Sequence, residues 1–506
     1  MKILEILLFV QVDTVWAQKW TSPGSSSDWA YAIAVNDSGY AYVTGVGAFS
    51  NTYDDWVTIK YSPYGDTIWV RRFSSPGYYN ERASSIAIGP YGNIYITGYT
   101  MSSGSGDFLI VKYRPNGDTA WTRRYNGIGN GYDFAHWISV DNYENVYVTG
   151  YSRGYNYQDD IAVVKYDSSG NQLWVARYNG SGNYNDKGHK VITEGNYVYV
   201  VGYVNPYSSG TFYDYVVLKY DLNGNLIWAR TYNGPSDSSD IARDIAVDNE
   251  GNVYVTGSSY GQGTSTDIVT IKYNSNGDVL WIARYNNDEV NGADGGYGIR
   301  VDNEGNVYVV GQSMGLNTGS DIVIIKYDSD GNLKWVTRYD GPVNGYDTPS
   351  DEVGGKCMAI DQFSNIYVGG TSRGETTYND YVVLMVDSSG VIRWEARYDF
   401  SDTIDYALAL AIDGNNGVYI TGRTLDPSTY YDWGTVKFVN LVGISENKKI
   451  SKSLFFESKE FVNLYDISGR LIKRFFNSSQ NSYYLKPGIY IFESNNQKSC
   501  KKVIIK

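Results

Sequence analysis

Cysteine, histidine, methionine and proline are scarce in this chain of 506 residues. The two cysteines, Cys357 and Cys500, fall in different segments, which excludes a disulfide framework and a zinc site of the usual spacing. Long apolar runs are also missing. The apolar run near the N-terminus, Ile3–Val10, is too short to span a membrane. This run indicates a short or truncated signal segment over residues 1–10, and no transmembrane span is expected.

Acidic residues outnumber basic ones, and the imbalance is unevenly placed. The whole chain has a net charge of -13. Between Ser445 and Lys506, 12 Lys and Arg stand against 5 Asp and Glu, so this segment carries +7 and the remainder -20. An acidic body repels phosphate backbones and anionic lipid head groups. Nucleic acid is therefore not an expected partner.

Aromatic residues and glycine, in contrast, are abundant. The 51 Tyr, 13 Trp and 55 Gly suit many short strands joined by turns, because aromatic side chains favour a pleated, half-buried surface and glycine supplies turn geometry. A Trp-anchored segment recurs eight times at intervals of 52 to 59 residues. The anchoring residues are Trp16, Trp69, Trp121, Trp174, Trp228, Trp281, Trp335 and Trp394.

Each repeat contains four apolar pieces bounded by Gly, Asn, Asp and Ser, such as IAVD, NVYVTG, DIVTIKY and a Trp segment followed by RYN. Short runs rich in Val, Ile and Tyr with such boundaries predict strands. Four strands per repeat predict one propeller blade. The expected fold class is therefore all-β, with an eight-bladed β-propeller of four-stranded blades over residues 11–440.

The two ends of the repeat array complement each other. The first Trp segment, Asp13–Thr21, has no partner strands before it, and the last copy, ending at Phe438, has no Trp segment of its own. We expect the N-terminal strand to complete the eighth blade and so close the ring without exposed sheet edges.

The recurrent D-x-x-GNVYVTG, D-x-x-x-x-KY and LWVARYNG pieces resemble the bacterial β-propeller repeat family known as SBBP, over roughly residues 13–440. The family name refers to seven-bladed members, whereas this chain has eight copies. The resemblance implies an extracellular or surface propeller and assigns no reaction.

The period stops after Asn440, and a basic linker over residues 441–460 leads to a C-terminal segment, 461–506. Alternating apolar pieces around a D-x-x-G turn predict a small β-sandwich-like domain there. LYDISGR, LKPGIYIF and KKVIIK resemble the sorting domain of the type IX (Por) secretion system, although its usual Pro-Asn-Pro opening is absent. The resemblance implies export across an outer membrane, and an accessory β-domain is the alternative. The matching residues are Leu464, Tyr465, Asp466, Gly469, Arg470, Leu485, Gly488, Tyr490, Lys501 and Lys502.

Turn lengths divide the predicted propeller into two faces. The first-to-second and third-to-fourth connections are tight, as in Asp248–Asn252, whereas the other connections vary between copies and emerge together on what we call the loop face. The opposite side is the turn face. Loops such as Asn205–Tyr213 are rich in Tyr, Ser and Gly, a composition that suits adaptable binding surfaces but is also expected where loops tolerate drift. The candidate contacts from these loops are Tyr155, Tyr207 and Tyr430.

One position near the loop-face start of the first strand differs from copy to copy, and it should lie near the mouth of the central channel. We call these eight residues the variable ring. A metal site of its two histidines with Asp133 and Asp186 is one alternative, but polar strand ends are the simpler interpretation, and no metal site is assigned. The ring comprises Tyr31, Ser84, His136, His189, Arg243, Tyr297, Lys356 and Leu408. Its ligand-binding candidates are Tyr31, His136, His189, Arg243, Tyr297 and Lys356.

Charged residues that recur in the copies are expected to serve the scaffold instead. An aspartate opens the third strand of every copy, an acid precedes most first strands, and Lys and Arg recur at fixed positions. One ligand site rarely needs eight copies, so these residues are interpreted as contacts within and between blades.

These features predict a secreted or outer-membrane surface-attached monomer that acts as a non-catalytic binding or adhesion module, without a cofactor. Its expected partners are a glycan or protein ligand on the loop face and the export machinery. A propeller enzyme is the alternative, either a polysaccharide lyase or a quinoprotein-type dehydrogenase, because fold alone does not decide function. A structural envelope protein is a third. Two histidines and no clustered catalytic motif leave little acid-base machinery.

Overall fold

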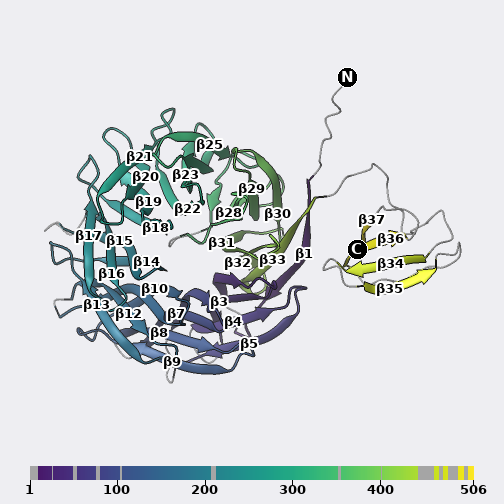
Figure 1. Ribbon diagram of the computed structural model, residues 1–506, viewed down its shortest axis with the longest axis horizontal. Coiled ribbons are helices and arrows are strands. Elements are labelled where there is room, and N and C mark those ends of the chain that lie inside the picture. The colour runs from purple at the N-terminus through teal and green to yellow at the C-terminus, as the bar shows by residue number, and fades with distance from the viewer. Residues whose placement is uncertain are drawn as a thin grey trace. The chain divides into compact units, whose positions relative to one another are not determined.

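The computed structural model describes residues 10–24, 27–49, 54–75, 80–102, 105–155, 157–206, 212–350, 355–400, 402–442, 461–466, 471–476, 488–494 and 500–505. The chain divides into two compact units, of which Val10–Val442 is the larger and Gly443–Lys506 belongs to the smaller. The described residues of the larger unit form eight antiparallel sheets arranged around a centre (Figure 1), which confirms the predicted eight-bladed, all-β propeller.

Seven blades follow the chain order directly, with the first strand of each innermost (Figure 1). Blades 1 to 4 are β2 (Trp29–Val35), β3 (Ala41–Ala48), β4 (Asp54–Tyr61) and β5 (Thr67–Phe73); β6 (Glu81–Ile88), β7 (Ile94–Ser102), β8 (Ser105–Tyr113) and β9 (Thr119–Tyr125); β10 (Asp133–Val140), β11 (Val146–Arg153), β12 (Asp159–Tyr166) and β13 (Gln172–Tyr178); and β14 (Lys187–Glu194), β15 (Tyr197–Val204), β16 (Asp214–Asp221) and β17 (Leu226–Tyr232).

The remaining blades follow the same pattern. Blades 5 to 7 are β18 (Asp240–Val247), β19 (Val253–Tyr260), β20 (Thr266–Tyr273) and β21 (Val279–Tyr285); β22 (Asp294–Val301), β23 (Val307–Gly315), β24 (Gly319–Tyr327) and β25 (Leu333–Tyr339); and β26 (Thr348–Pro349), β27 (Met358–Ile360), β28 (Ile366–Arg373), β29 (Asn379–Val386) and β30 (Ile392–Tyr398).

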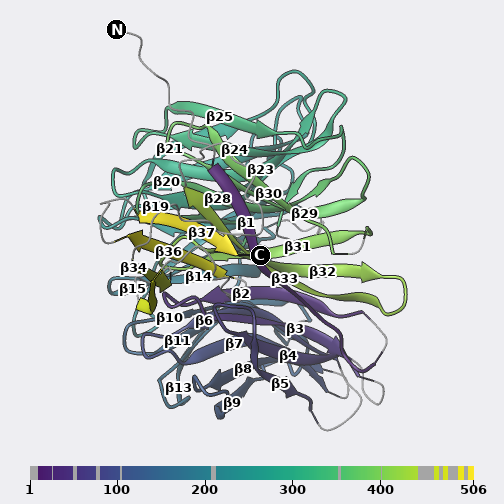
Figure 2. The same cartoon turned by 90° about the vertical axis from the view of Figure 1, so that its right-hand side faces the viewer.

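The eighth sheet joins the two ends of the repeat array. It has the order β1–β33–β32–β31, from β1 (Val10–Trp20), β33 (Tyr430–Val442), β32 (Val418–Asp426) and β31 (Asp405–Ile412). β1 runs beside β33 (Figure 2). Trp16 lies opposite Lys437 and Trp20 opposite Trp433. Trp16 is buried, and its indole donates a hydrogen bond to the carbonyl of Pro63 in blade 1 at 3.1 Å.

The tight turns follow from their sequences. In Asp248–Asn252 the Asp248 carboxylate accepts hydrogen bonds from the backbone N–H groups of Glu250 and Asn252, both at 2.9 Å. Gly251 has a φ of 80°, a conformation that glycine adopts without steric cost. Aspartate and glycine thus make the turn, and the same chemistry recurs on the turn face of the other blades.

Repeated side chains connect each blade to the next. The indole of Trp228 and the ammonium of Lys219 both donate to the carbonyl of Ser275, at 3.2 and 2.9 Å. Trp121 and Lys112 bond the carbonyl of Ser168 in the same way, and further copies repeat the pattern. A repeated Trp and Lys therefore anchor one blade on the turn of its neighbour.

Blade 7 departs from the repeat at its inner edge. Its first strand is reduced to the short pieces β26 and β27, in the copy with the 59-residue spacing. Gly355 donates its N–H to the carbonyl of Tyr297 in blade 6, and Leu410 of blade 8 donates to the carbonyl of Lys356. The segment that carries Lys356 is therefore held by both neighbouring blades.

The smaller unit contains one described sheet. Its order is β35–β34–β36–β37, from β35 (Leu471–Phe476), β34 (Phe461–Asp466), β36 (Gly488–Ser494) and β37 (Cys500–Ile505), and all pairs are antiparallel. The described residues give a single sheet where the sequence favoured a sandwich-like arrangement.

Across the parts of the chain that the structure describes, there is no helix with the length and apolar character needed to cross a membrane.

Candidate functional site

The variable ring coincides with irregular positions in the first strands. In seven blades the pairing of the first and second strands shifts register at the ring residue, for example between Ala135 and Trp137, on either side of His136. A β-bulge of this kind leaves one residue outside the regular ladder and redirects its side chain. The sequence signal of variation thus corresponds to a local backbone feature that repeats around the ring.

The two histidines lie side by side, as their sequence positions suggested. Their ring centroids are 5.9 Å apart. The Nδ1 atoms of His136 and His189 contact the carbonyl oxygens of Gly188 and Ala242, at 2.9 and 2.8 Å. A carbonyl only accepts, so both Nδ1 atoms carry the proton and each Nε2 keeps its lone pair. Burial lowers the pKa of His136 to about 4 and that of His189 to about 3, so both imidazoles are neutral at pH 7.

The two aspartates beside the histidines serve the backbone instead. Asp133 accepts from the N–H groups of Gly127 and Arg153, at 2.6 and 3.1 Å. Asp186 accepts from those of Gly180 and Asn205, at 2.6 and 2.8 Å. Within the described residues, neither histidine belongs to a group of three metal-ligating side chains. The alternative of a metal site built from these four residues therefore finds no support in the geometry.

Arg243 and Tyr297 line a loop-face pocket between blades 5 and 6. The pocket has a volume of about 310 Å³, and Ser258, Tyr260 and Gln312 also line it. The guanidinium of Arg243 lies 4.8 Å from the ring centre of Tyr297 and donates to the hydroxyl of Ser258. Asp294 also lines the pocket, but its carboxylate already accepts the N–H groups of Asn287 and Met314, at 3.0 and 3.1 Å. Arg243, an aromatic ring and neutral hydrogen-bonding groups thus face one cavity, a combination that suits a polar ligand bearing an acidic group.

Lys356 extends across the centre of the ring from blade 7. Its ammonium donates to the carbonyl of Ser84 in blade 2 at 2.7 Å and contacts that of Tyr31 in blade 1 at 3.4 Å. It also lies 5.6 Å from the ring centre of Trp137 in blade 3. Tyr31 in turn packs under the guanidinium of Arg82, 3.8 Å from its ring centre. Lys356 and Tyr31 therefore hold the channel mouth together.

A buried charge cluster one layer deeper escaped the sequence analysis. Asp244 directly follows Arg243 and pairs with Lys190 of blade 4 and with Arg300 of blade 6, the latter at 2.9 Å. Arg300 also donates to the carbonyl of Gly355 at 2.8 Å. The sequence does contain a sign of this cluster, because Lys190, Asp244 and Arg300 are charged at positions where most other copies have an apolar or small residue. It could be recognised only once the strands were seen to converge.

The candidate loop tyrosines lie farther from the channel. Tyr155 and Tyr430 expose 77% and 67% of their surface, so their rings are available to a ligand. Tyr430 has a φ of 67°, in the left-handed region that non-glycine residues seldom adopt. Tyr207 lies outside the described residues. The structure does not bring Tyr155 and Tyr430 together with the Arg243 pocket, so a ligand that used all of them would have to cover several blades.

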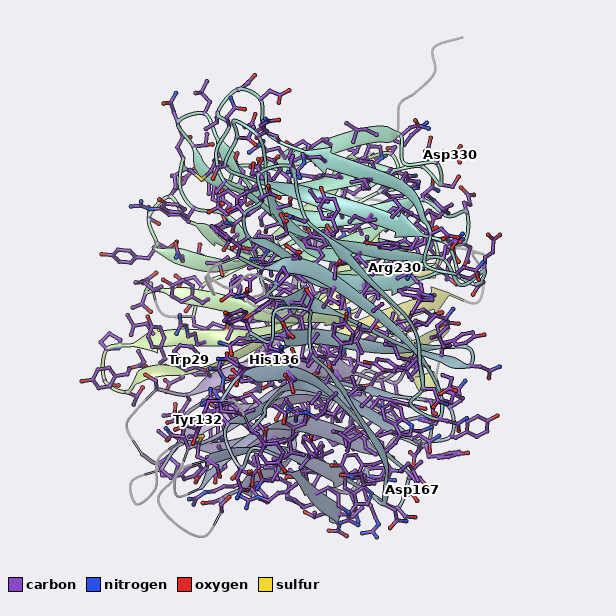
Figure 3. All side chains as sticks on the ribbon, turned by 90° about the vertical axis from the view of Figure 1, so that its left-hand side faces the viewer. Trp29, Tyr132, His136, Asp167, Arg230 and Asp330 are labelled. Carbon is purple, nitrogen blue, oxygen red and sulfur yellow. The ribbon has the colours of Figure 1, made fainter. Side chains whose placement is uncertain are left out.

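A larger hollow of about 480 Å³ lies on the turn face between blades 4 and 5. Its lining includes Lys219 and Trp228, which occupy repeated positions, together with Tyr197 and Glu250. Figure 3 views the ring from its edge and shows Asp167, Arg230 and Asp330 toward one side, with Trp29 and Tyr132 toward the other. A hollow on the turn face was not expected from the sequence.

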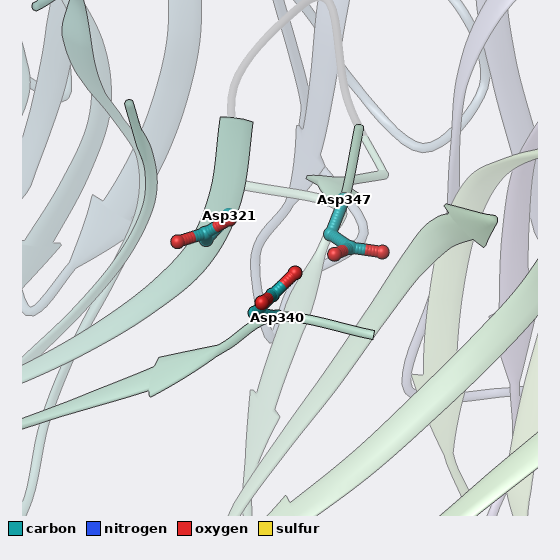
Figure 4. Close-up of side chains that lie close together, drawn as sticks. All are labelled: Asp321, Asp340 and Asp347. Carbon is teal, nitrogen blue, oxygen red and sulfur yellow. The ribbon is translucent and has the colours of Figure 1, made fainter. Parts of the chain in front are cut away.

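Acidic side chains gather on the loop face between blades 6 and 7. Asp321, Asp340 and Asp347 each place a carboxylate oxygen within 4.8 Å of the others (Figure 4). Asp321 forms an ion pair with Arg338 at 2.6 Å, and Asp347 accepts from the N–H of Gly341 at 2.7 Å. Burial raises the pKa of Asp340 and of Asp347, and nearby carboxylates raise both further. The group could hold a cation, but its own arginine already offsets part of the charge.

The sorting-motif residues are only partly described. Leu464, Tyr465 and Asp466 lie in β34, Gly488 and Tyr490 in β36, and Lys501 and Lys502 in β37. Gly469, Arg470 and Leu485 lie outside the described residues. The motif thus follows three strands of one sheet.

Two kinds of β-propeller repeat match parts of the chain. The SBBP beta-propeller repeat matches residues 227–263, and DUF5122, a beta-propeller domain of unknown function, matches residues 92–119. The chain is a β-propeller repeat protein. An uncharacterized WD repeat-containing protein of Acanthamoeba polyphaga mimivirus is 26% identical over 353 residues. That match covers 62% of this propeller protein and 23% of the viral protein, so the chain spans about a quarter of its relative.

Solved structures are similar to the propeller protein at low identity. They include the polysaccharide lyase Uly1, with 12% identity and a TM-score of 0.43 over 71% of this chain and 90% of that one. The β-propeller domain of the Trilobed protease from Pyrococcus furiosus has 9% identity and a TM-score of 0.42, over 74% of this chain and 99% of that one. A protein of unknown function from Bacteroides caccae has 13% identity and a TM-score of 0.31, over 60% of this chain and 97% of that one. These likenesses concern the fold and carry no functional argument.

Proposed function

We propose that this β-propeller is a non-catalytic binding module that holds a glycan or protein ligand on its loop face. The observation that carries the proposal is the pocket between blades 5 and 6. Arg243 and Tyr297 belong to the variable ring, and both line this pocket. Variation within an otherwise repeated strand is expected where copies have acquired a particular role, and loop faces on rigid scaffolds are where binding residues concentrate.

The chemistry of the pocket favours a polar ligand with a carboxylate or sulfate group. Arg243 supplies the positive charge, since the guanidinium matches the geometry of such oxyanions. Tyr260, which is 39% exposed, and Tyr297 offer aromatic surfaces on which a sugar ring or a side chain can stack. Gln312 and Ser258 add hydrogen-bonding groups at the wall.

A screen of glycan and protein arrays with the purified full chain tests this proposal. We expect acidic glycans or acidic protein segments among the binders, and loss of their signal in the Arg243→Ala variant. Glu250→Ala, an exposed substitution on the turn face, serves as the matched control and should retain the signal. Binding that is indifferent to Arg243 but depends on Glu250 would contradict the proposal.

The histidine pair supports one enzymatic alternative, a polysaccharide lyase. Two neutral imidazoles with Nδ1 bonded to carbonyls leave Nε2 lone pairs that could accept a proton from a substrate. Release of unsaturated products from acidic polysaccharides, followed by absorbance, distinguishes this reaction from binding. The His136→Ala variant should abolish such release if the alternative holds.

We further propose that the protein is secreted or displayed on an outer membrane and that β34 to β37 direct this export. The match of LYDISGR, LKPGIYIF and KKVIIK to a type IX sorting domain supports this, as does their position on one sheet. We also infer that the pairing of β1 with β33 closes the ring. Fusion of residues 443–506 to a reporter, expressed in a host with a type IX system, tests export directly.

A further inference from the structure

Every junction between blades contains a pair of acidic residues. One lies at or near the start of the third strand of a blade, and its partner lies at or just before the start of the first strand of the next blade. The backbone brings them together: the N–H of Asp240 donates to the carbonyl of Tyr213, next to Asp214, at 2.5 Å, and Asp186 and Asp347 repeat this bond. The pairs are Asp55 and Glu81, Asp107 and Asp133, Asp160 and Asp186, Asp214 and Asp240, Asp267 and Asp294, Asp321 and Asp347, Asp380 and Asp405, and Asp432 and Asp28.

Seven of these junctions contain a base of their own. The outer strand supplies an Arg, or a Lys from β1, that forms an ion pair with the third-strand aspartate. The guanidinium or ammonium offsets the charge of the two acids, as buried charges require. The ion pairs are Arg72 with Asp55, Arg124 with Asp107, Arg177 with Asp160, Arg284 with Asp267, Arg338 with Asp321, Arg397 with Asp380, and Lys19 with Asp432.

The junction between blades 4 and 5 departs from this rule. Thr231 stands where Arg177, Arg284 and Arg338 stand in other blades. Asp214 is only 7% exposed, and no ion pair to it is found among the described residues. Its Oδ1 atom is buried without a hydrogen-bond partner, as is that of six other third-strand aspartates. Among the described residues, however, Asp214 is the one third-strand aspartate of the eight that also lacks a pairing Arg or Lys. A carboxylate in this state is costly unless a positive charge reaches it.

The surroundings of Asp214 make the charge more negative. Burial, together with the charges of Asp240 and Asp237, raises its pKa to about 6. Asp237 is exposed on the loop at the mouth of the junction, where the corresponding residues Asn130, Asn183 and Asn291 are uncharged. Arg284 acts on Asp240 from a distance, but its guanidinium is bonded to Asp267 at 2.7 Å. Three acids therefore share a junction that lacks its own base.

We propose that the junction between β16 and β18 binds a divalent metal cation, with Asp214 and the Oδ1 atom of Asp240 as ligands in the place that an arginine fills elsewhere in the ring. The Oδ2 atom of Asp240 accepts the N–H of Gly234 at 2.6 Å and keeps that bond. Ca²⁺ is the best match, because it takes only oxygen ligands and accepts flexible geometry. The three-aspartate group of Figure 4 is a weaker candidate, because Arg338 already pairs with Asp321 there. Comparison of the junctions thus shows which base is missing beside Asp214 and which residue, an arginine at position 231, would replace it.

The test uses the full chain, stripped of metals with EDTA and then titrated with CaCl₂ by calorimetry and thermal unfolding. We expect saturable binding of one Ca²⁺ and a melting temperature that rises with Ca²⁺ concentration, since a ligand of the folded state stabilises it. MgCl₂ and NaCl serve as comparison cations. Asp214→Asn should weaken Ca²⁺ binding at least tenfold.

The Thr231→Arg variant tests the Ca²⁺ site independently, because it leaves every carboxylate in place. It restores the arginine of the other junctions, so we expect a higher melting temperature without Ca²⁺ and loss of the response to Ca²⁺. Asp340→Asn, in the group of Figure 4, is the matched control and should bind Ca²⁺ as the wild type does. No saturable binding by the wild type, or binding that survives both Asp214→Asn and Thr231→Arg, would overturn the proposal. So would a wild type whose stability responds only to acidification, because the junction would then hold a proton.

Discussion

The outer strands and the first strands of the blades obey different rules. In the third and outer strands the same Lys, Trp and Arg recur, and the Lys and Trp contact the same groups of the neighbouring blade, as Lys219 and Trp228 do at the carbonyl of Ser275. In the first strands the bulge residue changes from Tyr31 to His136 to Arg243, while the bulge itself remains. Residues that recur in every blade therefore build the ring, whereas a residue that changes at a fixed backbone position indicates a role particular to its blade.

The strongest disruption of the outer pattern is expected from deletion of residues 1–21. Blade 8 would lose β1, and with it the buried Trp16 and the contact of Trp20 with Trp433. Removal of one buried Trp alone costs about 3–5 kcal/mol, so the deletion should lower the free energy of unfolding by more than that. Thermal unfolding checks this. Deletion of residues 1–9 is the control, and equal melting of the two deletions would show that β1 does not close the ring.

The outer pattern was the part that the sequence could predict. The Trp spacing, the apolar pieces and the Asp-Gly turns are local signals, and they defined the eight blades and the two faces. The variable ring could be picked out because its residues depart from a known register, and seven of them stand at register shifts of the first strands. The Lys190–Asp244–Arg300 cluster and the unpaired Asp214 were missed, because both arise where strands from different blades converge, and only the closed ring reveals which charges meet.

The next largest effect should come from Asp244→Asn at the centre of the ring. The substitution would leave Lys190 and Arg300 without their shared partner, and breaking a buried ion pair from one side costs about 3–5 kcal/mol. Chemical unfolding measures the loss. The double variant Lys190→Met with Asp244→Leu should recover part of it, and an additive loss would show that the two residues do not act as a pair.

A smaller effect concerns the acid pairs at the blade junctions. Burial raises the pKa of Asp28, Asp186 and Asp214 to about 6 and that of Asp405 to about 7, above the ordinary value of 3.8. A raised pKa in the folded state means that stability is greatest with the carboxyls protonated and is lost as pH rises through 6 and 7. We therefore expect the melting temperature in EDTA to fall between pH 4 and pH 7 and to level off above pH 7.

Asp405→Asn sharpens this expectation. The amide keeps an acceptor for the N–H of Phe400, which Asp405 now accepts at 2.9 Å, but it does not ionise. The fall in melting temperature between pH 4 and pH 7 should be shallower than in the wild type. An unchanged profile would assign the pH dependence to other groups.

The smallest effect on stability is expected at the exposed loop tyrosines. Tyr155→Ala and Tyr430→Ala remove side chains that face solvent, so each should change the free energy of unfolding by less than about 0.5 kcal/mol. If either ring contacts the ligand, its loss should weaken binding by about 1–3 kcal/mol. Calorimetry with an array-identified ligand measures the second value, and a large loss of stability would contradict the assignment of these rings to the ligand surface.

The most direct test of the account compares the two hollows of the propeller with one ligand. Affinity for a binder found on the arrays would be measured by calorimetry for the wild type, for Arg243→Ala and Tyr297→Ala on the loop face, and for Tyr197→Ala and Glu250→Ala on the turn face. If the loop face binds the ligand, the loop-face variants should weaken binding at least fivefold while the turn-face variants bind as the wild type does. Loss of binding in Tyr197→Ala or Glu250→Ala, with Arg243→Ala unaffected, would contradict it and move the site to the turn-face hollow between blades 4 and 5.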